Sequence, residues 1–383
     1  MHEKTMSKLD LTTILRNLVQ TPTENPPGKT DHIIKYLISE VFKEEKGFHN
    51  EIIPYKKKDV ELKNLISTIG SGEKKIILSG HFDVVPAGDH NKWKYPPFSA
   101  EIVDGKLYGR GSSDMKAGLT MLIGTMLNLK EEFQLLDEYT FVFLGSADEE
   151  AGMTGAYTCF RKGIMKNAIL LIVGEPTNMN IGIAEKGLLW ISLEIQGKSA
   201  HSSTPNLGIN SIECALKLIP LLYSCLDEKE NKVLGKSTLN IGKIEGGSAI
   251  NIVPDKTTLT ADYRLIPEQD SGKLRRNLKN IQISPCTLET KVSHSLPALQ
   301  TDLNNTFIQN LLKYNKSKII GLPYASDAAV LVQPKKPVPF VIFGPGNPSN
   351  IHKIDEFVEL KQVFQATEYL TNALLQTYNK EKE

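Results

Sequence analysis

Residues that can bind a metal follow several apolar stretches of this chain. His81 and Asp83 come directly after "KKIILSG", which has the composition of a short buried strand. Asp148, Glu149 and Glu150 follow the similar run "EYTFVFLGS". In open α/β sheets, ligands bind beyond the carboxyl ends of the strands, so we expect these side chains to lie near one another.

Three further candidates have comparable positions. Glu175 follows the apolar run "AILLIVG", His352 lies in "GPGNPSNIHK" beyond the run "VPFVIF", and Asp114 lies in the glycine-punctuated loop "GRGSSDMKAG" before a predicted helix. Four carboxylates in one cavity would raise one another's pKa values unless cations intervene, and two divalent metals would balance their charge. Histidine nitrogen combined with carboxylate oxygen favours zinc, with cobalt or manganese as possible substitutes. The combined set is His81, Asp114, Glu149, Glu150, Glu175 and His352.

Each of these segments has an ordinary structural interpretation when taken alone. An isolated His-x-Asp is more often a surface or hydrogen-bonded pair than a metal site. "DEE" is typical of a turn or a helix start, and Asp114 suits a helix N-cap. The repeated placement of such residues after buried strands favours a common site.

The elements that must position these residues alternate along the chain. Helical periodicity marks residues 10–20, 32–45, 115–129 and 356–376. One apolar strand lies between the second and third of these helices, two follow the third, and one precedes the last. This alternation predicts an α/β fold with a mostly parallel sheet covered on both faces.

The pattern changes from about residue 187 to residue 296. There we expect a strand, a helix, two strands, a helix and a strand, which is the ferredoxin-like α+β order. The predicted organisation is a catalytic domain in two parts, residues 1–183 and 297–383, with residues 184–296 as an inserted domain.

Composition excludes some classes of partner. The chain of 383 residues has 45 basic and 44 acidic side chains, so no overall charge recruits nucleic acid or an anionic membrane. The start, "MHEKTMSKLD", is too charged for a signal peptide, and no stretch is apolar enough to span a bilayer, so we expect a cytoplasmic protein. The scattered cysteines without a CxxC pair indicate reduced thiols rather than a disulfide framework.

Seven segments together resemble a known family. They are "GHFDVVPAGD", "KWKYPPFSAEIVDGKLYGRGSSDMKAG", "ADEEAG", "VGEPT", "GKSAHSSTPNLGINSI", "INIVPD" and "NIHKIDE". In order and spacing they are similar to the dinuclear zinc deacylases and peptidases of the M20 family, in its acetylornithine deacetylase and succinyl-diaminopimelate desuccinylase branch. The resemblance runs from about residue 10 to about residue 375 and implies a zinc-hydrolase catalytic domain with an inserted lid and dimerisation domain.

The resemblance also implies a ligand set. His81 and Glu175 would each bind one zinc, Glu150 and His352 would bind the other, and Asp114 would bridge the two. The family further implies a cis peptide between Asp114 and Met115.

The resemblance implies roles in catalysis as well. Asp83 would orient the His81 ring through its second nitrogen. Glu149 would be the general base that takes a proton from metal-activated water and passes it to the leaving amine. His201 in "GKSAHSS" matches a histidine that reaches the active site of a partner subunit and stabilises the oxyanion, which implies a homodimer formed through the inserted domain.

Substrate contacts are implied at three more positions. Asn251 in "INIVPD" and Arg264 in "ADYRLIP" match residues that hold the substrate, and an arginine suits a substrate carboxylate. Ser326, next to Asp327 in "YASDAAVL", matches a substrate-side loop but departs from the glycine-rich form usual there.

The implied reaction is hydrolysis of a small N-acyl amino acid. Glu at position 175, where aminopeptidase and dipeptidase branches have Asp, favours N-acyl amino acids or carboxypeptidase-type substrates. We expect N-succinyl-LL-diaminopimelate, in lysine biosynthesis, as the leading substrate. Acetylornithine deacetylase and an M20 carboxypeptidase are the alternatives.

Two hypotheses from other classes remain open. A protein of this fold could bind a metal or metabolite without turnover, although both Glu149 and Asp114 are present. An interaction scaffold that uses the inserted domain for binding would contain no metal.

Overall fold

The structure is a computed structural model that describes residues 8–333 and 335–379, so most of the charged segment 1–10 lies outside the described residues. The chain forms two compact units. The first comprises the described parts of Met1–Ile183, Thr301–Ile320 and Ser326–Glu383, and the second comprises Ala184–Gln300 and Gly321–Ala325. Within the described residues, no helix has the length and apolar character needed to cross a membrane.

The larger sheet is mixed, with a parallel centre. At its centre β6, β3, β7 and β17 run parallel to one another, while β1, β2, β8 and β15 pair antiparallel at the two sides. The expected α/β class with a mostly parallel central sheet is confirmed. In spatial order the strands are β1 (His49–Lys57), β2 (Val60–Ile69), β6 (Tyr139–Ser146), β3 (Lys74–His81), β7 (Ala168–Val173), β17 (Phe340–Ile342), β8 (Ile181–Glu185) and β15 (Leu299–Gln300), and β16 (Ile319–Leu322) also pairs with β8.

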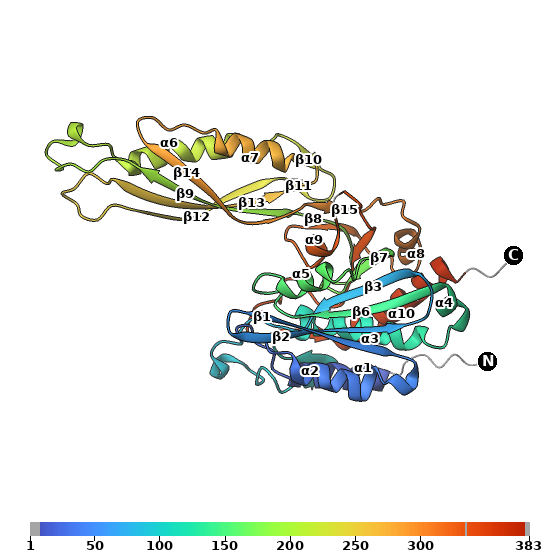
Figure 1. The fold of residues 1–383 in the computed structure, drawn as a ribbon. Coiled ribbons are helices and arrows are strands. Elements are labelled where there is room, and N and C mark those ends of the chain that lie inside the picture. The colour runs from blue at the N-terminus through green and yellow to red at the C-terminus, as the bar shows by residue number, and fades with distance from the viewer. Residues whose placement is uncertain (1–7, 334, 380–383) are drawn as a thin grey trace. The chain divides into compact units, whose positions relative to one another are not determined.

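Both faces of the parallel centre are covered. Consecutive residues are buried over the last part of β3, β6 and β7, although successive side chains point to opposite faces. Helix α3 (Ala117–Leu129) packs against β3 and β6, and α10 (Leu360–Tyr378) packs against α3 and α8 (Thr306–Tyr314) (Figure 1). The carboxyl ends of these strands are therefore buried within the core of the first unit.

The first unit contains further helices and a small second sheet. Its other helices are α1 (Lys8–Gln20), α2 (Asp31–Tyr36), α4 (Phe133–Glu138), α5 (Thr154–Arg161) and α9 (Ala328–Leu331), and helical turns lie at Leu37–Val41, Glu44–Lys46 and His90–Lys92. A small sheet contains β18 (Phe357–Glu359), β5 (Lys106–Tyr108) and β4 (Glu101–Val103). The expected start of the last helix at residue 356 was wrong, because Phe357 pairs with Tyr108 in this sheet and the helix begins at Leu360.

The second unit has the expected ferredoxin-like order. The four antiparallel strands are arranged β12-β13-β9-β14, and α6 packs against β9, β12 and β13 (Figure 1). Its elements are β9 (Gly187–Gln196), the turn Pro205–Leu207, α6 (Ser211–Ser224), β10 (Glu230–Asn231), β11 (Gly235–Lys236), β12 (Thr238–Gly246), β13 (Lys256–Leu265), α7 (Ser271–Lys279) and β14 (Thr287–Leu296).

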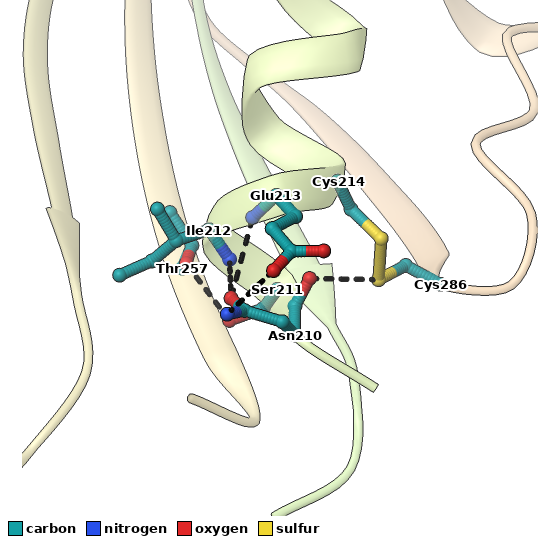
Figure 2. The surroundings of a disulfide bond; sticks show 7 residues. All are labelled: Asn210, Ser211, Ile212, Glu213, Cys214, Thr257 and Cys286. Carbon is teal, nitrogen blue, oxygen red and sulfur yellow. Dashed lines mark hydrogen bonds between the residues drawn. A yellow bond between two sulfur atoms is a disulfide. The ribbon is translucent and has the colours of Figure 1, made fainter. Parts of the chain in front are cut away.

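The expectation of reduced cysteines was wrong for one pair. Cys214 in the first turns of α6 and Cys286 just before β14 form a disulfide, although 72 positions separate them (Figure 2). Both belong to the apolar core of the second unit, so tertiary packing brings together residues whose spacing gives no local signal. Cys159 and Cys225 are free and buried. Cysteine usage therefore no longer argues for a reducing compartment.

Candidate metal centre

The candidate ligands lie at one edge of the parallel centre. His81 is the last residue of β3, Glu150 lies in the turn that follows β6, and Glu175 lies just beyond β7. Strand β3 is the parallel neighbour of both β6 and β7, so their carboxyl ends share this edge. The loop after β17, which runs parallel to β7, carries His352. The candidate ligands that follow separate strands in the sequence therefore lie close together in space.

Asp114 lies between two histidines. Its Oδ1 is 3.3 Å from Nε2 of His81, and its Oδ2 is 3.3 Å from Nε2 of His352. Each imidazole also faces a second carboxylate: Nε2 of His81 is 3.7 Å from Oε1 of Glu175, and Nε2 of His352 is 3.1 Å from Oε1 of Glu150. The Asp114 carboxylate therefore lies between two pairs of side chains. One pair is His81 with Glu175, and the other is His352 with Glu150.

These residues fit divalent cations. Ligand atoms of His81, Asp114 and Glu150 lie within 4.8 Å of one another. Oδ1 of Asp114 is buried and receives no well-aligned hydrogen bond from the described residues. A bound cation would supply the partner that this buried oxygen lacks. Imidazole nitrogen with carboxylate oxygen is the donor set that zinc accepts. The peptide between Asp114 and Met115 is cis, as the resemblance implied.

The charges of the cluster point the same way. Burial, together with Glu150 and other acids nearby, raises the pKa values of Glu149 and Glu175 well above their usual range. Burial alone would lower the pKa of His81, but Asp114 and Glu175 raise it well above its ordinary value. Divalent cations would stabilise the ionised carboxylates, and they would compete with protons for both imidazoles because ligand histidines bind as the neutral form.

His81 has a defined orientation. Its Nδ1 is 2.8 Å from the backbone carbonyl oxygen of Asp83. A carbonyl oxygen only accepts, so Nδ1 carries the hydrogen and the lone pair of the neutral ring is on Nε2, the atom that faces Asp114 and Glu175. The contact expected between Asp83 and the second ring nitrogen is therefore made by the backbone carbonyl, while the Asp83 carboxylate lies farther away, at 3.8 Å from Nδ1.

The Asp83 carboxylate holds a different segment. Its oxygens accept the backbone N–H groups of Glu149 at 3.1 Å and Glu150 at 3.2 Å, and the side-chain amide of Asn25 at 2.9 Å. Asp148 is not part of the cluster, because its carboxylate pairs with Nζ of Lys57 at 2.6 Å. Asp83 therefore positions the turn that carries Glu149 and Glu150.

Sequence reasoning missed three residues that support this site. Asn25 donates to both Asp83 and Asp148 through its side-chain amide. Arg110 and Glu356 form a buried ion pair of 2.7 Å beside the Asp114 loop. "GRG" before Asp114 and "DE" after His352 were in quoted motifs, but single polar residues in loops give no sign of their long-range partners.

The second unit brings His201 and Asn251 together. His201 forms a β-bridge with Ile252, and the backbone N–H of Ser202 donates to the carbonyl oxygen of Asn251 at 3.1 Å. The His201 side chain is exposed, and its Nδ1 lies 2.8 Å from Oγ of Ser203. Residues of these two segments, among them Ser202 and Ile250, line a cavity of about 530 Å³ in this unit.

Arg264 and Ser326 have less open surroundings. Nε of Arg264, on β13, lies 3.0 Å from Oδ1 of Asp262, which orients the guanidinium. Ser326 in the first unit is buried, and its hydroxyl accepts the N–H of Ala328 at the start of α9. Its neighbour Asp327 accepts the hydroxyl of Ser146 at 2.5 Å. The polar side chains of this loop therefore form hydrogen bonds within the protein.

Comparison with known proteins identifies the family. A model described as peptidase family M20/M25/M40 matches residues 77–376. The chain belongs to this family. The resemblance inferred from the seven segments is thereby confirmed, and the M20 chain is a hydrolase.

Two of the curated relatives of the M20 chain are named as deacylases. A protein of Staphylococcus aureus named "Probable succinyl-diaminopimelate desuccinylase" is 31% identical, over 99% of this chain and 100% of that protein. An acetylornithine deacetylase of Proteus mirabilis is 29% identical, over 95% of this chain and 96% of that protein.

Solved structures of M20 proteins share the fold. A tripeptidase of Staphylococcus aureus superposes with a TM-score of 0.76 at 22% identity, covering 98% of this chain and 100% of the other. A protein of Bacillus subtilis described as a dinuclear metal binding peptidase of the M20 family gives a TM-score of 0.71 at 18% identity, with 98% and 99% coverage. At these identities the likeness establishes the fold of the M20 chain.

Proposed function

We propose that this chain is a dinuclear zinc amidohydrolase that removes an N-acyl group from an amino acid. The observation that carries the proposal is the shared position of Asp114, with one oxygen toward His81 and the other toward His352. His81 and Glu175 would hold one ion, Glu150 and His352 the other, and Asp114 both. Cobalt or manganese are possible substitutes for zinc.

The chain's own residues account for the proton transfers of amide hydrolysis. Bound zinc supplies Lewis acidity toward the amide carbonyl and lowers the pKa of water. The carboxylate of Glu149, whose pKa is already raised by burial, takes a proton from water and gives it to the leaving amine. Asp83 holds the Glu149 backbone, so the base stays near the two ligand groups. His201 would stabilise the developing oxyanion as a donor.

N-succinyl-LL-diaminopimelate is the leading substrate. The full-length relative from Staphylococcus aureus supports this choice by its name, and the Proteus mirabilis relative keeps acetylornithine as the alternative. Arg264 is the candidate for a substrate carboxylate because Asp262 orients its guanidinium. Asn251 is the candidate for a hydrogen bond to an uncharged group of the substrate. The side chain of Ser326 is buried, so any contact at this position would come from other atoms of its loop.

We also propose a homodimer formed through the second unit. Strand β12 pairs with β13 on one side, and within the described residues its other edge is unpaired. Ile244 on this strand and Leu216 and Tyr223 on α6 are exposed apolar side chains. A long edge strand with apolar neighbours suits pairing with a second copy. Sedimentation of wild type and of Ile244→Glu tests this: a monomeric wild type would contradict it.

An amine-release assay tests the proposed reaction. Zinc-loaded protein is given N-succinyl-LL-diaminopimelate, N-acetylornithine, other N-acyl amino acids and peptides with a C-terminal glutamate, each with and without chelator. Turnover of the succinyl substrate that chelator abolishes and zinc restores is the expected result. Turnover of acetylornithine alone would select the alternative. A protein that binds two zinc ions but hydrolyses none of the panel would contradict the proposed substrate class.

A further inference from the structure

Glu356 is a buried carboxylate that the proposed ligand set does not include. The residue is 1% exposed and lies shortly after His352 in the chain. Its Oε1 accepts the backbone N–H of Ser113 at 2.8 Å and of Asp114 at 3.0 Å. Its Oε2 accepts the backbone N–H of Gly111 at 3.1 Å and Nη1 of Arg110 at 2.7 Å. One side chain therefore holds the loop that presents Asp114.

All partners of this carboxylate are donors. A protonated carboxyl would place its own O–H against an N–H, so the arrangement requires the ionised form. A buried anion is stable only when it is paired and hydrogen-bonded, and the Arg110 guanidinium and the backbone amides meet both conditions. Glutamine at this position would turn one acceptor into a donor that faces other donors.

Arg110, the partner of Glu356, also forms hydrogen bonds to the loops that contain Lys353 and Pro86. Its Nη1 also donates to the carbonyl oxygen of Lys353 at 3.1 Å, and its Nη2 donates to that of Pro86 at 3.4 Å. Its guanidinium carbon lies 5.1 Å from the ring centre of Trp93. Lys353 directly follows His352, so the ion pair contacts the loops of both Asp114 and His352.

We propose that Glu356, paired with Arg110, is a positioning residue that sets the place of Asp114 relative to His352 and thereby the metal affinity of the site. This inference rests on the proposed function, in which both residues are ligands. Metal sites tolerate only a few tenths of an ångström in ligand position, and loss of an outer hydrogen-bond partner typically weakens binding about 10–100-fold.

Metal binding is measured with Zn²⁺ and Co²⁺ alone, by calorimetry and by the visible spectrum of the cobalt form. Glu356→Gln should weaken binding about 10–100-fold and change the cobalt spectrum, while Glu356→Asp, which keeps the charge on a shorter side chain, should restore part of the affinity. The matched control is Glu24→Gln, because Oε1 of Glu24 also accepts a backbone N–H, that of Ala87 at 2.7 Å, but contacts no proposed ligand. It should bind both metals as wild type does.

A folded Glu356→Gln protein with wild-type affinity and spectrum would overturn the inference. If Glu356→Gln does not fold, hydrogen exchange of the metal-free wild type decides. The amides of Gly111, Ser113 and Asp114 should then be protected, and exchange at the rate of an unstructured chain would overturn the inference. A wild type that binds neither metal would instead contradict the proposed function, so the two failures are distinguishable.

Discussion

The backbone carbonyl of Asp83 accepts a hydrogen bond from the ring of His81 at 2.8 Å, while the Asp83 carboxylate accepts the amides of the Glu149–Glu150 turn. One residue thus orients the ligand His81 through its main chain and, through its side chain, holds the turn that carries both the ligand Glu150 and the base Glu149. Asp83→Asn preserves the carbonyl but leaves a single acceptor oxygen on the side chain. We expect Zn²⁺ affinity and kcat each to fall about 10–100-fold. Calorimetry and steady-state kinetics measure the two effects, and wild-type values of both would contradict a positioning role for this carboxylate.

Glu149→Ala separates the base from the ligands. Glu149 lies close enough to His81 to raise the pKa of that imidazole, but it is not one of the proposed ligands, so both metals should still bind. General acid–base groups typically contribute a factor of about 10²–10⁴, and kcat should fall by that amount. Metal content by elemental analysis and the rate of amine release are measured on the same sample. Unchanged turnover would exclude Glu149 as the base.

Gly118 in α3 tests the packing behind Glu175. A Cβ added at Gly118 would lie 1.7 Å from the carbonyl oxygen of Gly174, the residue before Glu175. Gly118→Ala must displace backbone, so we expect a loss of stability of at least about 1–3 kcal/mol and weaker metal binding. The control is Gly242→Ala, where the nearest side-chain atom is 3.8 Å away. Denaturant unfolding compares the two, and equal stabilities would contradict the close packing.

Lys116 predicts a pH dependence of stability. It is fully buried, its Nζ donates to the carbonyl oxygen of Thr21, and burial lowers its pKa to about 7 from 10.5. Between these values the unfolded chain binds more protons than the folded one, so this group makes the folded protein more stable as pH rises. Lys116→Met removes the effect. The stability of the variant relative to wild type should therefore decline by up to about 1.4 kcal/mol per pH unit over that window.

Urea unfolding of metal-free protein at several pH values measures this difference. A constant difference between Lys116→Met and wild type from pH 7 upward would show that Lys116 keeps an ordinary pKa. The absolute stability of either protein does not decide the matter, because other groups titrate in both.

The disulfide Cys214–Cys286 should stabilise the second unit by about 2–4 kcal/mol, because it restricts the unfolded chain. Cys214→Ser, or reductant added to the wild type, should lower the free energy of unfolding by a similar amount, which is observed as a lower midpoint of denaturant unfolding. The double variant Cys214→Ser with Cys286→Ser is the control, since its stability should not respond to reductant. A wild type with the same midpoint in both conditions would contradict a stabilising disulfide.

Sequence alone identified the residue types of the site because each follows a local pattern. His81, Glu150 and Glu175 each come after an apolar run, and runs of that kind form the parallel centre of the sheet. Local periodicity also predicted the order of elements in the second unit. It did not predict β18, because the short pairing of Phe357 with Tyr108 depends on a strand far away in the chain.

Other features depend on contacts between distant segments, which local pattern cannot report. The hydrogen bonds of Glu356 to the Asp114 loop and of Asn25 to Asp83 each join segments far apart in sequence, and Cys214 and Cys286 meet only because both face one core. The sequence by itself therefore determined the family, the order of elements and the candidate ligands. Only the tertiary structure decided which groups orient them, because hydrogen bonds depend on distances and angles that exist only after the chain has packed.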